Sequence, residues 1–326
     1  SQLNPDFISV TYSAGGSGNN GATTKIAQMI DADFGIPSVA HLTCISLKRA
    51  DLLAKIDEMR AAGIQNVLAL RGDVPQGAPT GPGCADYRYA KDIIPHLVDA
   101  GFCVGAAAYP EGHIECDDLE LSVRQLKEKQ DAGASFLVTQ LFFDNQYFYR
   151  FRELAERAGI TVPITAGIMP FMGKQQISRM VFMCGASLPS PVIKLLARYE
   201  DDADSLRAAG IEYACRQLED LAANGVDGLH IYTMNRADVA GAPALSRSEM
   251  LRYLGYSGQE LDQDLQQRIE DAAAGVVADA RICGVRRVFS VDASALDEQG
   301  DPCIALENTC VRLRGRDIFR HLKDAR

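Results

Sequence analysis

Polar side chains that could bind a ligand recur where the apolar stretches of this chain end. They are Thr11, Tyr12, His41, Thr43, Arg71, Asp73, Tyr109, His113, Gln140 and Arg236. The set has neither the spacing of a metal site nor an obvious nucleophile. Two arginines and two histidines favour anionic groups, and polar groups that become buried need partners. We therefore expect a site for a large, partly anionic organic ligand and no bound metal. The alternative is that each histidine is only a hydrogen-bonded structural group.

Residues 66–77 carry the strongest of these signals. The strand-forming run Asn66–Leu70 stops at Arg71, Gly72 and Asp73, and a proline and a second glycine follow soon after. A buried parallel strand that enters a functional loop ends in this way. A capped turn with a solvated ion pair is the alternative.

Seven strand-like segments are separated by helical ones, and this alternation is what would bring the polar residues together. The strand-like segments are residues 7–12, 38–44, 66–70, 103–113, 136–144, 164–170 and 228–236. The helical segments are residues 23–34, 47–62, 89–100, 119–132 and 146–158, with two more before residue 228. Such alternation predicts a parallel α/β sheet, and seven repeats favour a closed TIM-type (β/α)8 barrel over an open sheet. The carboxyl ends of the strands would then share one mouth, where barrels bind ligands.

A barrel of this class has eight strands, whereas seven are found here. Because the chain opens on a strand without an initiator Met, we interpret these seven as strands two to eight. Residues 1–240 are then an incomplete barrel. In residues 241–326 the alternation of strands and helices ends. We therefore predict a separate small α+β domain there, with helices at 246–254 and 262–274 and a strand at 287–291.

Composition excludes several classes of protein. The 326 residues are 47% hydrophobic and 23% charged, which predicts a folded core. A net charge of −10 argues against a nucleic-acid partner. Nine cysteines without paired spacing indicate reduced thiols, and neither a membrane-length apolar run nor a signal peptide is present, so we expect a cytoplasmic protein. The glycine-rich residues 15–18 could cradle a phosphate, but no GxGxxG motif follows a strand.

Seven ordered phrases resemble the methylenetetrahydrofolate reductase family over residues 5–240. They are Val10-Thr11-Tyr12, Ala40-His41-Leu42-Thr43-Cys44, Leu70-Arg71-Gly72-Asp73-Val74-Pro75, Ala108-Tyr109-Pro110-Glu111-Gly112-His113, Thr139-Gln140-Leu141-Phe142-Phe143-Asp144, Gly167-Ile168-Met169-Pro170 and His230-Ile231-Tyr232-Thr233-Met234-Asn235-Arg236-Ala237. The resemblance implies an FAD-containing barrel that reduces 5,10-methylenetetrahydrofolate to 5-methyltetrahydrofolate in one-carbon and methionine metabolism. NADH or NADPH is the expected reductant.

The resemblance also assigns roles to individual residues. Those implied to bind FAD are Thr11, Tyr12, Ala14, His41, Arg71, Gly72, Asp73, Ala90, Tyr109, His113 and Lys129. Those implied to bind folate are Gln140, Gln176 and Arg236. Three cationic groups among the first set could neutralise a pyrophosphate. At family positions that contact the dinucleotide, this chain carries different residue types: Ser122, Gln125 and Glu128.

Asp73 is the expected catalytic residue. A carboxylate near the flavin disfavours the anionic reduced form, which makes it a better hydride donor, and the same charge favours a cationic iminium form of the substrate. The family's usual general acid is a Glu on the first barrel strand, and we find no counterpart for it in this chain. We therefore expect an open barrel with poor catalysis, unless another segment supplies that strand.

The tail and the partners have open alternatives. Residues 245–256 resemble the start of proteins related to the activation domain of methionine synthase, but an interaction or oligomerisation appendage is the alternative. Expected partners are the folate substrate, a second copy of the chain, and methionine synthase or an electron-donor protein. The competing functions are a non-catalytic flavin- or folate-binding subunit of a larger methyl-transfer complex, or another barrel such as a pterin-dependent synthase or an aldolase. No Schiff-base lysine stands out for an aldolase.

Overall fold

The computed structural model describes residues 5–12, 20–45, 47–73, 85–234 and 288–292. Its centre is a barrel of parallel strands that neighbour one another in chain order. The strands are β1 (Phe7–Thr11), β2 (Ser38–Thr43), β3 (Asn66–Leu70), β4 (Cys103–Ala108), β5 (Phe136–Thr139), β6 (Ile164–Ile168), β7 (Gly228–Tyr232) and β8 (Val288–Asp292). Each of the seven strand-like segments contains one of β1–β7, so the predicted parallel α/β fold is confirmed.

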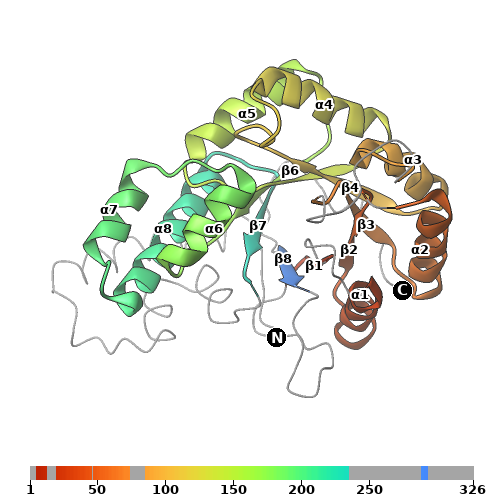
Figure 1. Cartoon of the computed structure of the whole chain (residues 1–326), viewed down its shortest axis with the longest axis horizontal. Helices are drawn as coiled ribbons and strands as arrows, with labels where there is room; N and C mark the ends of the chain where they lie inside the picture. The colour runs from red at the N-terminus through yellow and green to blue at the C-terminus, as the bar shows by residue number, and fades with distance from the viewer. Residues whose placement is uncertain (1–4, 13–19, 46, 74–84, 235–287, 293–326) are drawn as a thin grey trace.

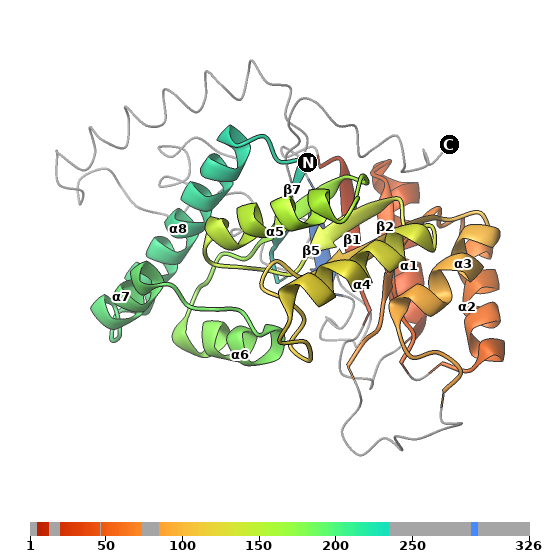
Figure 2. The same cartoon turned by 90° about the horizontal axis from the view of Figure 1, so that it is seen from above.

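The helices cover the outside of this sheet, as Figures 1 and 2 show. They are α1 (Asn20–Phe34), α2 (Arg49–Ala61), α3 (Ala90–Asp99), α4 (Leu119–Asp131), α5 (Asn145–Arg157), α6 (Lys174–Cys184), α7 (Ser190–Arg198) and α8 (Ala203–Ala223). One helix stands between successive strands as far as β6. Three helices lie between β6 and β7, where the sequence predicted two.

The strand β8 comes from the segment that the sequence assigned to a separate domain. It pairs in parallel with β1, from Phe7 with Val288 to Thr11 with Asp292, and also with β7. Seven consecutive strands thus curl into a half-barrel, and β8 joins its two edges (Figure 1). The barrel is therefore closed and not open, because another segment supplies a strand, which is the exception that the sequence analysis allowed. The rest of residues 241–326 lies outside the described residues, so the division into two domains stays a prediction.

Small residues on neighbouring strands leave room for aromatic side chains inside the barrel. The rings of Phe7 and Phe136 lie 6.3 Å apart, and both are fully buried. A Cβ atom at Gly105 on β4 would lie 2.4 Å from the Phe136 ring, which is closer than atoms can pack. Gly105 therefore makes room for the aromatic ring that fills the lower barrel.

A second apolar cluster lies under α6, α7 and α8. Its buried members include Phe143, Phe171, Ile177 and Leu206. At Gly210, α8 approaches so closely that a Cβ atom would lie 1.9 Å from the backbone oxygen of Phe171. These contacts fix the position of α6, which carries Gln176.

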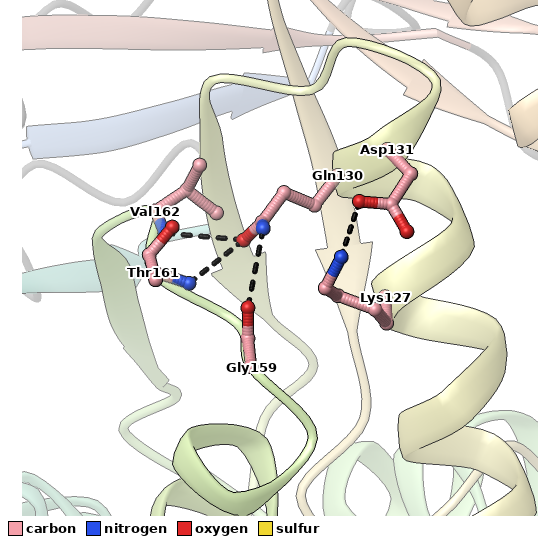
Figure 3. A network of polar contacts seen from close by, with 6 residues as sticks. All are labelled: Lys127, Gln130, Asp131, Gly159, Thr161 and Val162. Carbon is pink, nitrogen blue, oxygen red and sulfur yellow. Dashed lines mark hydrogen bonds and ion pairs between the residues drawn. The ribbon is translucent and has the colours of Figure 1, made fainter.

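The amino-terminal end of β6 is tied to α4 through one glutamine (Figure 3). The Oε1 atom of Gln130 accepts from the backbone N–H groups of Thr161 at 2.8 Å and Val162 at 3.2 Å. On the same helix, Lys127 pairs with Asp131. In barrels this end of the strands serves stability, and Gln130 accordingly anchors the helix that also carries Lys129.

Candidate functional site

The turn after β3 places Arg71 and Asp73 at the carboxyl ends of the strands. Gly72 has a φ of +83°, and a Cβ atom there would lie 2.8 Å from the Cβ atom of Thr43 on β2. Only glycine fits both conditions without strain. The backbone N–H of Ile45 donates to the Arg71 carbonyl at 2.8 Å, which holds this turn against the end of β2.

Arg71 is the cationic centre of the site. Its guanidinium forms a two-point ion pair with Glu115, and one arm, Nη2 to Oε1, measures 3.0 Å. The hydrogen bond to Glu115 raises the pKa of Arg71, and the hydrogen bond to Arg71 lowers the pKa of Glu115. The charge of Arg71 also acts on the half-buried Tyr109. An arginine in this state stays charged at any working pH.

Lys129 reaches the same region from α4. Its Nζ donates to the Ala107 carbonyl at 2.8 Å and lies 5.4 Å from the centre of the Tyr109 ring. Burial, followed by the nearby charge of Arg71, lowers the pKa of Lys129 to about 8. Lys129 is therefore a cation at neutral pH whose charge a bound anion would stabilise.

His113 differs from the expected cation. Burial and then the charge of Arg71 lower its pKa below the ordinary value, so its imidazole is neutral at pH 7. Its Nδ1 accepts from the backbone N–H of Glu115 at 3.1 Å, and its ring meets Tyr109 edge-on at 4.8 Å. His113 thus offers its Nε2–H as a neutral donor, and the positive charge here comes from Arg71 and Lys129.

Two histidines come from opposite parts of the strand order: His41 on β2 is half-buried, and His230 on β7 is buried. Burial lowers the pKa of His41 on β2 to about 4 and that of His230 on β7 to about 3, so both are neutral. The Nε2 of His230 lies 3.1 Å from the Ser9 hydroxyl. Within the described part of the chain, the Nε2 of His41 and the Nδ1 of His230 have no hydrogen-bond partner. Buried nitrogens in this condition suit a ligand with hydroxyl or amide groups.

The two glutamines expected to bind folate come from different elements. Gln140 follows β5, and its Oε1 accepts from the backbone N–H of Leu141 at 3.0 Å. Gln176 lies on α6, and its Oε1 accepts from the backbone N–H of Met172 at 2.8 Å. These bonds fix both amide groups. Tyr232, at the end of β7, donates its hydroxyl to the carbonyl of Thr139, the residue before Gln140, at 2.7 Å.

The remaining expected residues are placed only in part. Thr11 ends β1, and its carbonyl accepts from the Thr23 hydroxyl at 3.1 Å. Tyr12 follows it, and burial raises the pKa of its phenol. Ala90 is buried at the start of α3. Ala14 and Arg236 lie outside the described residues, so the structure says nothing of their positions.

Three residues of the site escaped sequence reasoning. Glu115 follows a polar turn, where it reads as a surface charge, and only folding brings it to Arg71. His230 and Tyr232 belong to a phrase that resembles the family. They are two residues apart on β7, and side chains alternate along a strand, so the sequence could have predicted that both lie on the same face of the sheet.

The arrangement suits a dinucleotide better than a metal. Among the described residues, no group of three or more His, Cys, Asp or Glu side chains could hold a metal ion. The described helices also include none long and apolar enough to cross a membrane. Two cations beside an aromatic ring match a pyrophosphate, and the unpaired nitrogen of His41 matches the polar groups of a flavin. The residues present therefore fit the expected cofactor.

Comparison with known proteins gives the family. The family model described as methylenetetrahydrofolate reductase matches residues 1–242. The chain belongs to the methylenetetrahydrofolate reductase family. This confirms the predicted resemblance for the barrel, and the relatives that match carry the names of oxidoreductases.

Relatives from distant organisms support this membership. The chain is 35% identical over 243 residues to 5,10-methylenetetrahydrofolate reductase of Escherichia coli, covering 74% of this chain and 80% of that protein. It is 35% identical over 234 residues to methylenetetrahydrofolate reductase 1 of Schizosaccharomyces pombe, covering 71% of this chain and 39% of that protein. The chain thus spans less than half the length of the yeast relative.

Other family members carry the name of a reductant. The Arabidopsis thaliana relative named methylenetetrahydrofolate reductase (NADH) 1 is 33% identical and covers 71% of this chain and 41% of that protein. A solved Clostridium thermocellum protein, described as binding two copies of 5-methyl-5,6,7,8-tetrahydrofolic acid, covers 67% of this chain and 83% of its own. Its identity is 14% and its TM-score 0.42, so this likeness carries no argument about function.

Proposed function

We propose that this chain reduces 5,10-methylenetetrahydrofolate to 5-methyltetrahydrofolate with FAD as its cofactor and NADH or NADPH as reductant. Family membership over residues 1–242 supports the reaction class. The observation that carries the cofactor is the grouping of Arg71 and Lys129 around Tyr109 at the carboxyl ends of the strands. This is a site for a dianionic group beside a planar one.

Different residues around the mouth at the carboxyl ends of the strands bind different parts of the cofactor. Arg71 and Lys129 hold the pyrophosphate through charge-assisted hydrogen bonds, and His113 adds a neutral donor. The buried Nε2 of His41 meets a polar group of the isoalloxazine or ribityl portion. Thr11 and Tyr12 close the same mouth from β1. When bound, the flavin supplies the hydride that reduces the methylene carbon.

The substrate is held from the other side of the mouth. Gln140 and Gln176 present amide groups that their backbone partners hold in place, and such groups match the pterin ring. Arg236 is proposed for the folate carboxylates. Hydride addition turns the bridging carbon into a methyl group on N5, and N10, which loses that bond, takes a proton. The Asp73 carboxylate stabilises the positive charge of the iminium form that precedes hydride addition.

A spectroscopic experiment tests the proposal. The full chain is loaded with FAD and reduced with NADH or NADPH without oxygen, and 5,10-methylenetetrahydrofolate is then added. We expect the flavin absorbance to bleach and then return, with one 5-methyltetrahydrofolate formed per flavin. Tetrahydrofolate, which lacks the methylene bridge, is the control and should leave the flavin reduced. Bound flavin that the substrate does not reoxidise would instead indicate a binding subunit.

A further inference from the structure

The ion pair between Arg71 and Glu115 has a consequence for ligand affinity. Both terminal nitrogens of Arg71 contact the two carboxylate oxygens of Glu115, so that the terminal edge of the guanidinium is occupied by an anion of the protein itself. The Arg71 side chain is 19% exposed, whereas that of Glu115 is 60% exposed. The arginine is therefore fixed in the site, and the glutamate approaches it from the solvent side.

Glu115 lies in a short turn, and its exposed side chain can rotate away from Arg71. The turn begins after β4 and ends at α4, and its backbone is held by bonds such as Glu115 N–H to His113 Nδ1 at 3.1 Å. The carboxylate itself contacts only Arg71 among the hydrogen bonds of the described residues. Rotation of one exposed side chain would thus free the guanidinium without unfolding any element.

A carboxylate and a phosphate compete for the same arginine in two ways. Both prefer the paired N–H groups of a guanidinium, and two anions that share one cation repel each other. The neighbouring positive group, Lys129, is engaged with the Ala107 carbonyl and does not contact Glu115 in any recorded hydrogen bond or ion pair of the described chain. The competition therefore centres on Arg71.

We propose that Glu115 is an internal competitor that lowers the affinity of Arg71 for anionic ligands and so sets how tightly the site holds a pyrophosphate-containing cofactor. The inference rests on the proposed function insofar as the natural anion is the pyrophosphate of FAD. The competitor role itself needs only an anion at Arg71. The affinity for neutral ligands, such as a flavin without phosphates, should not depend on Glu115.

The test measures dissociation constants on the full chain freed of flavin. The ligands are FAD, riboflavin, which lacks phosphates, and inorganic pyrophosphate. The variants are Glu115→Gln and Glu115→Ala, each alone and combined with Arg71→Gln. The matched control is Glu153→Gln, which removes an exposed carboxylate paired with Arg157 on α5.

We expect both Glu115 variants to bind FAD and pyrophosphate about two- to fivefold more tightly, the range that an exposed ion pair supports. Riboflavin binding and the Glu153→Gln variant should not change. In the Arg71→Gln background the gain should vanish, because the competition acts through that arginine. Equal or weaker FAD and pyrophosphate binding by both Glu115 variants would overturn the inference, as would an equal gain for riboflavin.

Failure of the proposed function gives a different pattern. A chain that binds pyrophosphate but neither FAD nor riboflavin in any variant would refute the flavin assignment. The pyrophosphate measurements would still decide whether Glu115 competes for Arg71.

Discussion

Single residues of the mouth differ from their usual chemistry because of what surrounds them. His113 is neutral since burial and Arg71 disfavour its charge, and Lys129 is easily deprotonated for the same reasons. Asp73 lies in the turn after β3, where its charge acts on Tyr109 and on Cys184 of α6. These environments give two residue-level predictions.

Replacing Asp73 by Asn should keep FAD bound but slow folate reduction by about 100-fold, because a preorganised charge that stabilises the iminium is lost. Single-turnover reoxidation of reduced flavin by 5,10-methylenetetrahydrofolate measures this step. Asp57→Asn, an exposed change on α2, is the control and should have no effect. An Asp73→Asn chain with an unchanged reoxidation rate would remove the carboxylate from the mechanism.

The affinity for FAD should fall as pH rises through about 8, the pKa of Lys129. Below that pH Lys129 is charged and attracts the pyrophosphate. Above it, Lys129 must take up a proton when FAD binds, so the affinity for FAD falls by up to about tenfold per pH unit. Titrations of FAD at pH 7, 8 and 9 measure the slope. The Lys129→Arg variant keeps its positive charge at all three pH values, so its affinity for FAD should depend little on pH. A wild-type affinity equal at pH 7 and 9 would contradict the assignment.

At the level of elements, close helix packing positions the side of the barrel mouth that we propose binds folate. α8 lies against the segment after β6 because position 210 is glycine, and the same cluster supports α6 with Gln176. A bond between Ser187 and Glu111 adds a second support: the Ser187 N–H donates to a Glu111 carboxylate oxygen at 3.0 Å. The loop after β4 therefore holds the loop after α6.

Gly210→Ala should reduce the free energy of unfolding by about 1–3 kcal/mol, because the added carbon must displace the backbone oxygen of Phe171. Urea denaturation measures the change. Gly173→Ser is the control, since no atom lies within 4 Å of its Cβ position, its φ of −176° suits any residue, and serine is accepted at this N-cap of α6. The control should change stability by less than about 0.5 kcal/mol. Equal effects of the two substitutions would mean that α8 can shift freely.

The whole molecule depends on one strand that is distant in the chain. β8 lies 55 residues beyond the end of β7, counting residues 233–287, yet it pairs with both β7 and β1. Without that pairing, the backbone groups of β1 and β7 that face β8 would lose their partners, which is costly for buried strands.

Ser290→Pro should lower the free energy of unfolding by about 1–3 kcal/mol, because proline removes a backbone donor from the centre of β8. Ser290 is in register with Ser9 of β1 and Tyr232 of β7. Ser290→Thr keeps the N–H group and should be neutral by comparison. Thermal and urea unfolding of the full chain measure both variants. If the proline variant is as stable as the threonine variant, the barrel does not need β8.

The sequence by itself determined the rhythm of elements, the parallel sheet and the family. The apolar period and the helix ends are local properties, so β1–β7 and the polar residues at their carboxyl ends were predictable from them. Only the tertiary structure decided which distant residues meet. The Arg71–Glu115 pair spans 44 residues and the Ser9–His230 contact spans 221. The physical reason is that these features depend on neighbours that only folding brings together. They include barrel closure by β8, the neutral state of His113, and the buried nitrogens of His41 and His230.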